Sequence, residues 1–234
     1  MENWILQSIL LIGAIGERNK MKQQTDILHI IEELKKLYPD SICSLDYPKP
    51  YELLFSVRLA AQCTDERVNQ VTPALFARFP TLESLAEADI SEVESYIHST
   101  GFFRAKARDI VAASRMMLEQ FDGNVPDNME DLLKLPGVGR KTANLILGDV
   151  YHTPGVVVAD PHCIRISGKL GLTDGTKDPA KVEAQLRAVL PPEESNDFCH
   201  RLVLHGRAVC TARKPDCQSC TLRPWCDFFQ KEVG

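Results

Sequence analysis

The sequence predicts an all-α protein. Apolar residues recur at intervals of three and four along most of the chain, which places them on one face of successive helices. Helix-start signals, such as the pair Asp178-Pro179, precede several of these stretches. The only run typical of a strand, Val156–Val158, is too short to build a sheet.

Each predicted helix is marked by its apolar positions and by residues suited to its start or end. The start signals are Thr25-Asp26, Thr64-Asp65, the capping-box pair Ser91 and Glu94, and Asp178-Pro179. Pro39 ends the first helix, and Gly123 ends a long amphipathic helix over about residues 104–121. The remaining apolar faces consist of Ile27, Ile30, Ile31, Leu34 and Leu37; Val68, Val71, Leu75 and Phe76; Tyr96 and Ile97; and Val182, Leu186 and Val189.

The composition is that of a globular protein with a sizeable core: 234 residues, 44% hydrophobic and 25% charged. A formal net charge of −5 argues against a protein that coats nucleic acid through overall positive charge. Basic residues are nevertheless concentrated in two segments, which predicts a local positive face. One segment contains Arg104, Lys106, Arg108 and Arg115; the other, residues 201–214, contains Arg207 and Arg213 and no acidic residue.

The first twenty residues differ from the rest of the chain. The apolar run Trp4–Ile15 is too short to span a bilayer, and it follows Glu2 rather than the basic region of a signal peptide. Another interpretation is that translation begins at Met21, because codons for residues 16–18 can form a purine-rich ribosome-binding site. Residues 1–20 would then be a non-native N-terminal extension. We expect a cytoplasmic protein that does not enter the membrane.

The most informative segment is the string L-P-G-V-G-R-K-T-A-N at residues 135–144. One apolar helix is predicted to end at Pro136 and a second to begin near Arg140, which makes a helix–hairpin–helix over about residues 130–147. Gly137 and Gly139 permit a tight turn with positive φ between them. Such a turn points backbone N–H groups outward at a helix N-terminus, where they can bind a DNA phosphate without reading bases. A lone G-V-G would indicate only a turn between packed helices, but the basic pair after it favours phosphate binding.

Two residues are candidates for chemistry, and each has a structural alternative. Lys141 lies in the first turn of the second hairpin helix, where a lysine usually contacts phosphate as a point charge. The positive end of a helix dipole disfavours an ammonium ion, so the amine is also suited to attack C1′ of a deoxyribose. Asp160 follows four apolar residues and precedes Pro161, which is the pattern of a helix N-cap. Its carboxylate could also stabilise positive charge that develops on a sugar.

Eight cysteines divide into two groups. Cys43, Cys63, Cys163 and Cys199 are scattered among apolar neighbours, whereas Cys210, Cys217, Cys220 and Cys226 have the spacing C-x6-C-x2-C-x5-C. This asymmetry favours a metal or cluster site over a disulfide framework. Four thiolates can hold either a [4Fe–4S] cluster or one tetrahedral zinc ion. Arg213 and Lys214 lie in the first gap, so ligation would stiffen a loop that presents two cations.

Together these segments resemble the endonuclease III family of DNA glycosylases. The resemblance extends from about Met21 to Cys226, and it includes the hairpin string, the Val-Ala-Asp segment, and the H-G-R and A-R-K-P motifs at residues 205–207 and 212–215. The cysteine spacing is characteristic of that family's [4Fe–4S] cluster, so the resemblance implies this cluster rather than zinc. It also implies two lobes: a six-helix barrel domain at residues 43–154 and an iron–sulfur cluster domain at residues 21–42 plus 155–234.

The same resemblance implies roles for individual residues. Lys141 matches the lysine nucleophile and Asp160 the essential aspartate. Gln62 matches the residue that fills the gap left by a flipped-out nucleotide, and Phe102 the residue that wedges into the base stack, with core packing as the alternative for Phe102. The family usually has threonine where this chain has Pro161, which puts the fine geometry and the substrate preference in question.

The implied activity is removal of oxidised pyrimidines from duplex DNA, followed by β-elimination that nicks the abasic strand, carried out by a monomer. A monofunctional glycosylase of the same superfamily is one alternative, although Lys141 argues against it. A non-catalytic helix–hairpin–helix DNA-binding protein with a structural metal is the other. That second alternative predicts that borohydride does not trap the protein on abasic DNA.

Overall fold

The computed structural model describes residues 22–40 and 43–232 of the chain. These ranges contain α-helices and short 3-10 turns and no strand, so the predicted all-α fold is confirmed. Val156–Val158 crosses from one hydrophobic core to the other in an extended, unpaired conformation. No helix within the described ranges is long and apolar enough to cross a membrane. The interpretation of residues 1–20 as a non-native extension lies outside the described residues.

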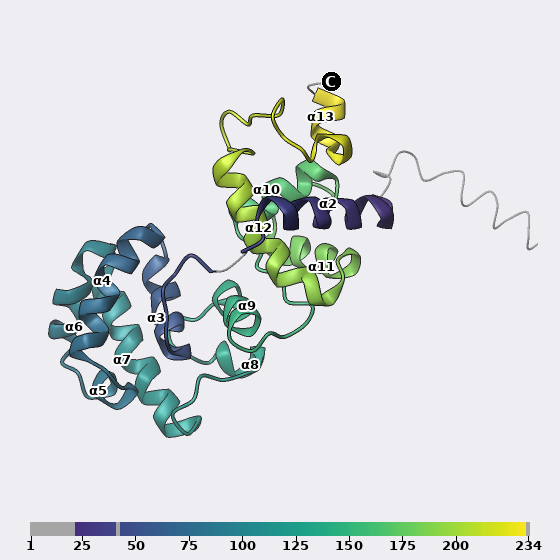
Figure 1. Ribbon diagram of the computed structural model, residues 1–234. Coiled ribbons are helices and arrows are strands. Elements are labelled where there is room, and N and C mark those ends of the chain that lie inside the picture. The colour runs from purple at the N-terminus through teal and green to yellow at the C-terminus, as the bar shows by residue number, and fades with distance from the viewer. Residues whose placement is uncertain (1–21, 41–42, 233–234) are drawn as a thin grey trace, which may run out of the picture.

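The helices separate into two lobes, each with its own buried core (Figure 1). The core of the large lobe, residues 43–156, contains fully buried leucine side chains, among them Leu53, Leu59 and Leu75. Its elements are α3 (Pro50–Ala60), α4 (Asp65–Arg78), α5 (Leu82–Ala86), α6 (Ile90–Ile97), η1 (His98–Thr100), α7 (Phe103–Gln120), α8 (Met129–Leu132) and α9 (Arg140–Asp149).

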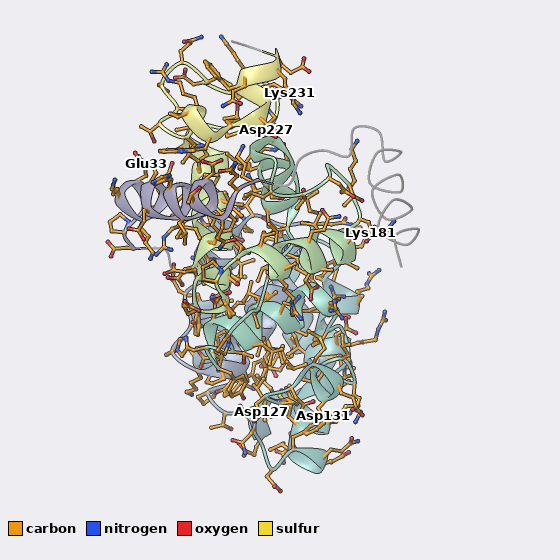
Figure 2. The ribbon with its side chains drawn as sticks, turned by 90° about the vertical axis from the view of Figure 1, so that its right-hand side faces the viewer. Glu33, Asp127, Asp131, Lys181, Asp227 and Lys231 are labelled. Atoms are coloured by element: carbon orange, nitrogen blue, oxygen red, sulfur yellow. The ribbon has the colours of Figure 1, made fainter. Side chains whose placement is uncertain are left out.

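The small lobe, residues 22–40 and 157–232, joins segments from both ends of the described chain. Its elements are α2 (Gln24–Leu37), α10 (Pro161–Leu170), α11 (Pro179–Val189), η2 (Pro192–Glu194), α12 (Ser195–Ala208), η3 (Arg223–Trp225) and α13 (Asp227–Glu232). Helix α2 buries four residues of the predicted apolar face, Ile27, Ile30, Ile31 and Leu34, in this lobe's core. The fifth, Leu37 in the last turn, is exposed instead. Figure 2 shows Asp127 and Asp131 at the opposite end of the molecule from Asp227 and Lys231.

Three of the four helix starts predicted from residue type are close to the observed ones. Thr64 caps α4 by accepting from the Arg67 N–H, and Asp178 caps α11 by accepting from the Ala180 N–H at 2.9 Å. Helix α2 begins at Gln24, one residue ahead of the predicted Thr25-Asp26 signal. The prediction of a capping box that begins at Ser91 is wrong. Asp89 caps α6 instead, because its carboxylate accepts from both the N–H and the hydroxyl of Ser91, each at 2.7 Å.

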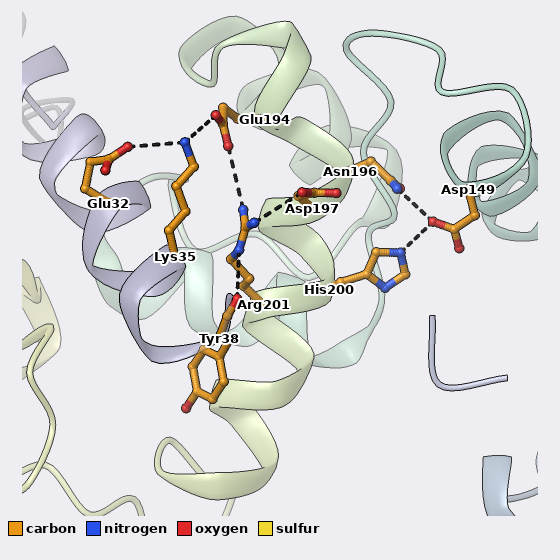
Figure 3. Close-up of polar contacts among 9 residues, drawn as sticks. All are labelled: Glu32, Lys35, Tyr38, Asp149, Glu194, Asn196, Asp197, His200 and Arg201. Atoms are coloured by element: carbon orange, nitrogen blue, oxygen red, sulfur yellow. Dashed lines mark hydrogen bonds and ion pairs between the residues drawn. The ribbon is translucent and has the colours of Figure 1, made fainter. Parts of the chain in front are cut away.

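Helix α12 fixes the junction between the lobes (Figure 3). At one side, its Asn196 and His200 each lie 2.7 Å from the carboxylate of Asp149, the buried last residue of α9. At the other side, its Arg201 donates to the Tyr38 carbonyl at the end of α2. Helix α12 therefore contacts both α9 of the large lobe and the end of α2 in the small lobe, and it fixes the position of one relative to the other.

Candidate functional site

The predicted hairpin joins α8 to α9 through an irregular turn. Helix α8 ends at Leu132, well before Pro136, where the sequence predicted its end. The reason is local: proline disfavours helical conformation in the residue before it, and Leu135 instead closes a tight turn onto Leu132. The side chains of Leu135 and Val138 pack into the large-lobe core and hold the turn in place.

The two hairpin glycines serve different purposes. Gly137 has φ +76°, and a Cβ there would lie 2.7 Å from both Arg58 Nε and Asp109 Oδ2, so only glycine fits over this ion pair. Gly139 has φ −106°, so the expected positive φ is wrong for this residue. Nothing lies within 4 Å of a Cβ built at Gly139, which leaves open space in front of α9. The first main-chain bond of α9 joins Ala143 N–H to the Gly139 carbonyl, so the N–H groups before it are free for an anion.

Arg140 and Lys141 begin α9 and point to different surroundings. The Arg140 guanidinium donates to both carboxylate oxygens of Glu183 on α11, at 2.8 Å each. Lys141 is exposed and lines a cavity between the lobes. The basic pair in the sequence thus divides into one residue that joins the lobes and one that faces the open space.

Asp160 is the N-cap of α10, as the sequence predicted. Its Oδ1 accepts from the Cys163 N–H at 2.6 Å, and Pro161 occupies the first helical position. The side chain is half-buried and lines the same cavity as Lys141. Because the cap uses only Oδ1, the carboxylate keeps a second oxygen for another partner.

The cavity has a volume of about 450 Å³ and is lined by residues from five separate segments of the chain. It brings Gln62, Lys141 and Asp160 together, whereas Phe102, the hairpin glycines and the four clustered cysteines lie outside its lining. Its wall also includes Cys43, Asp65, His200 and Arg207, none of which the sequence had assigned to the catalytic site. Arg207 donates to Asp65 at 2.8 Å and so joins the two lobes at the cavity.

Burial and neighbouring charges shift the pKa values of Asp65 and His162, which line the cavity. Burial raises the pKa of Asp65, but this effect is outweighed by hydrogen bonds from Ser44 and Arg207 and by the charges of Arg207 and Lys141, so that its pKa is lowered. Burial also lowers the pKa of His162, and the nearby Arg165 adds to that effect. The charge of Asp160, which lines the same cavity, opposes this lowering of the His162 pKa.

Gln62 and Phe102 occupy exposed turns with strained backbones. Their φ values are 56° and 48°, in the left-handed region that non-glycine residues rarely adopt. The Phe102 ring is 69% exposed, so core packing, the alternative for this residue, is wrong. Lys106, which the sequence placed in a basic surface segment, is fully buried instead.

The four clustered cysteines line one small pocket in the small lobe. Burial raises the pKa of both Cys220 and Cys226, and the charges of the neighbouring cysteines raise it further. Arg165 donates to the carbonyl of Cys210 and lies 3.6 Å from its sulfur. Among the described residues no three side chains converge closely enough for a single metal ion. Arg213 and Lys214 are exposed in the loop between the first two cysteines.

Comparison with known proteins identifies the family. The family model described as HhH-GPD superfamily base excision DNA repair protein matches residues 55–192. The endonuclease III of Synechocystis sp. is 50% identical over 212 residues, which cover 91% of this chain and 95% of that protein. The endonuclease III of Escherichia coli K12 is 38% identical over 213 residues, covering 91% and 98%. The chain belongs to the endonuclease III family.

A solved structure agrees with this assignment. A trapped endonuclease III–DNA covalent intermediate matches with a TM-score of 0.84 and 36% identity, covering 92% of this chain and all of that one. The family resemblance seen in the sequence is confirmed, and so is the class of enzyme it implied. As a member of the endonuclease III family, the chain is a base-excision DNA glycosylase with AP lyase activity.

Proposed function

We propose that this enzyme removes oxidised pyrimidines from duplex DNA with Lys141 as nucleophile and Asp160 as its carboxylate partner. The observation that carries the proposal is that Lys141, Asp160 and Gln62 line one cavity of about 450 Å³ between the lobes. A cavity of this size accommodates a single base that has been rotated out of the duplex. Gln62, at the edge of the same cavity, fills the gap that the base leaves behind.

The reaction follows from these positions. The amine nitrogen of Lys141 forms a bond to C1′ while the C1′–N bond to the base breaks and the base leaves with that electron pair. Asp160 stabilises the positive charge that develops on the sugar. Opening of the sugar ring gives an imine, loss of a proton from C2′ expels the 3′ phosphate, and water releases Lys141. The strand is thereby nicked 3′ to the lesion.

Double-stranded DNA that contains a damaged base or an abasic site is the proposed partner. The free N–H groups at the start of α9 bind a phosphate, with Gly137 and Gly139 keeping side chains out of the way and Arg140 contributing its backbone N–H. Phe102 wedges into the stack from its exposed turn, and Arg213 and Lys214 contact further phosphates. We infer a monomer that works in the cytoplasm and associates with the nucleoid through DNA.

A [4Fe–4S] cluster held by Cys210, Cys217, Cys220 and Cys226 completes the small lobe. Support comes from the shared pocket of these four cysteines, from the apolar wall formed by Ile166, Leu170 and Leu222, and from the Arg165 contact with the Cys210 sulfur. When bound, the cluster would link Cys210 and Cys217, the two ends of the loop that carries Arg213 and Lys214. The large lobe corresponds to the barrel domain and the small lobe to the cluster domain.

Borohydride trapping tests the catalytic proposal. The protein is incubated with duplexes that carry an oxidised pyrimidine or an abasic site, and reduction by borohydride should fix a covalent adduct. Lys141→Gln should give none. Absence of an adduct with every duplex, together with intact DNA binding, would favour the non-catalytic alternative, and base release without an adduct would favour a monofunctional glycosylase. Broad absorbance in the visible blue distinguishes the cluster from zinc.

A further inference from the structure

Lys106 is a lysine with no exposed surface, on α7. Its ammonium group donates to two backbone carbonyls, those of Leu59 and Thr100, at 2.8 Å each. It forms no ion pair with any carboxylate of the described residues. Burial lowers the pKa of its amine, and of the nearby titratable groups Cys63 raises that pKa and Arg58 lowers it. A methionine would fill the same space without a buried charge, but it could not make these two hydrogen bonds.

The first carbonyl anchors the turn that carries Gln62. Leu59 lies in the last turn of α3, where carbonyl groups lack helical partners and a cation is favourable. The chain then folds sharply, with the Cys63 N–H bonded to the Ala60 carbonyl at 3.0 Å. Gln62 sits inside this turn in its left-handed conformation. The ammonium therefore fixes the base of the Gln62 turn.

The second carbonyl anchors the turn that carries Phe102. Thr100 is almost fully buried, and Gly101 and Phe102 follow it with φ values of 70° and 48°. The backbone N–H of Lys106 also bonds to the Phe102 carbonyl, at 3.2 Å. Lys106 thus holds this turn on both sides of Gly101, once through its side chain and once through its backbone.

We propose that Lys106 is a positioning residue that ties the Gln62 turn to the Phe102 turn, so that the two side chains enter a damaged duplex as one rigid unit. The inference rests on the proposed roles of these two side chains. Left-handed conformations persist only where the surroundings enforce them, and one ammonium group enforces both. It is not a catalytic residue, because it has no access to the DNA.

The test uses the full-length enzyme with Lys106→Met and Lys106→Gln, and with Lys36→Met as an exposed-lysine control. Hydrogen exchange of the free proteins comes first. Exchange should accelerate in both turns of the Lys106 variants and in neither turn of the control. Acceleration in one turn alone would overturn the proposal. In the unsubstituted enzyme, both turns should open with the same dependence on urea, and different dependences would also overturn it, even where a variant does not fold.

Function is measured by 2-aminopurine fluorescence beside a lesion, which reports extrusion, and by single-turnover base release. In Lys106→Met both should fall on the order of tenfold or more, because loop misplacement disturbs geometry at the site. Nicking of an abasic site in single-stranded DNA, which needs no extrusion, should stay within about threefold. Extrusion and base release equal to the unsubstituted enzyme would refute the positioning role.

Two further variants distinguish a failure of this inference from a failure of the roles proposed for Gln62 and Phe102. If Gln62→Ala and Phe102→Ala each leave extrusion unchanged, the roles of those side chains fail, while the exchange data still decide whether Lys106 couples the turns. If both substitutions reduce extrusion, the double variant is compared with the two single variants. The effects of Gln62→Ala and Phe102→Ala should be strongly non-additive when Lys106 is present and close to additive in the Lys106→Met background. Equal coupling in both backgrounds would contradict the proposal.

Discussion

The Arg140 guanidinium and the Glu183 carboxylate form a two-pronged ion pair, with both N···O distances at 2.8 Å. Glu183 is 3% exposed and lies on α11 in the small lobe, whereas Arg140 opens α9 in the large lobe. Asn144 also donates to this carboxylate and Arg187 forms an ion pair with it at 3.0 Å, so the buried charge is compensated. The pair sets where the start of α9, and hence Lys141, lies relative to the small lobe.

Glu183→Ala should destabilise the protein by about 2 kcal/mol, because Asn144 loses an acceptor and the lobes lose their shared contact. Urea unfolding measures this change. Single-turnover base release should fall on the order of tenfold, since Lys141 loses its fixed position. Glu130→Ala is the matched control, because its pair with Lys134 is exposed to solvent, and its urea midpoint should not move. Equal effects of both substitutions would contradict the role of the buried pair.

Asp160→Asn separates helix capping from catalysis. Asparagine caps a helix about as well as aspartate, so stability should change by less than about 0.5 kcal/mol. Base release should nevertheless fall by roughly 10²- to 10⁴-fold, because the charge that assists the sugar is lost. The two quantities are read from thermal unfolding and from single-turnover kinetics. An Asp160→Asn enzyme of normal activity would leave Asp160 as a cap only.

Gly137→Ala should weaken DNA binding and cost more stability than backbone strain alone. The left-handed φ costs about 1–2 kcal/mol in alanine, and the new Cβ would also collide with the Arg58–Asp109 ion pair. Gly175→Ala is the control for strain, since Gly175 has φ +81° and open space around a built Cβ. Binding to an abasic duplex, measured by fluorescence anisotropy, should fall only for the Gly137 variant. Similar losses in both variants would argue against a special role for the hairpin.

Cys43 should resist alkylation although it lines the cavity. Burial raises the pKa of its thiol to about 12. At pH 8 the thiolate fraction is then lower than for a free cysteine by roughly three orders of magnitude. Iodoacetamide labelling followed by mass spectrometry should be slow at pH 8 and rise about tenfold per pH unit, whereas labelling in urea should be fast. Because only the unfolded chain loses this proton above about pH 8.5, the thiol also lowers stability as the pH rises beyond that value.

Arg213→Ala and Lys214→Ala should each weaken binding to any duplex sequence to a similar extent. Each removes one phosphate contact, so the slope of log K against log salt should become less steep by about one. The exposed Lys36 on α2 provides the control, and Lys36→Ala should leave the slope unchanged. A loss of affinity that depends on base sequence would show that these residues read bases instead.

Local residue types were sufficient to predict the helices and several of their ends. The apolar spacing of α2, the Asp178 cap and the Asp160 cap are set by neighbours in the chain, so the sequence alone predicts them. Predictions failed where a competing residue lay nearby. Asp89 displaced Ser91 as a cap, and α8 ended at Leu132, before Pro136, where the sequence predicted its end.

The site was predicted in part. The hairpin string and the cysteine spacing are patterns of residues that lie close together in the sequence, and both predicted the correct family. The side-chain partners of Arg140 and Lys106 could not be predicted for a common reason: a basic side chain in a sequence shows its charge but not its partner. Glu183 is far from Arg140 along the chain, and the carbonyls that surround Lys106 belong to backbone, which leaves no signature in residue type.

The sequence by itself determined the all-α fold, the hairpin, the cap at Asp160 and the family, because each depends on contacts within a few residues. Only the tertiary structure decided that Lys141, Asp160 and Gln62 line one cavity, that Asp65 and Arg207 meet beside it, and that a buried lysine supports two exposed turns. The physical reason is that these contacts join segments far apart in the chain, either across the two lobes or, for Lys106, between neighbouring elements of the large lobe. Which residues contact one another therefore depends on their distance in the folded protein and not on their separation in the sequence.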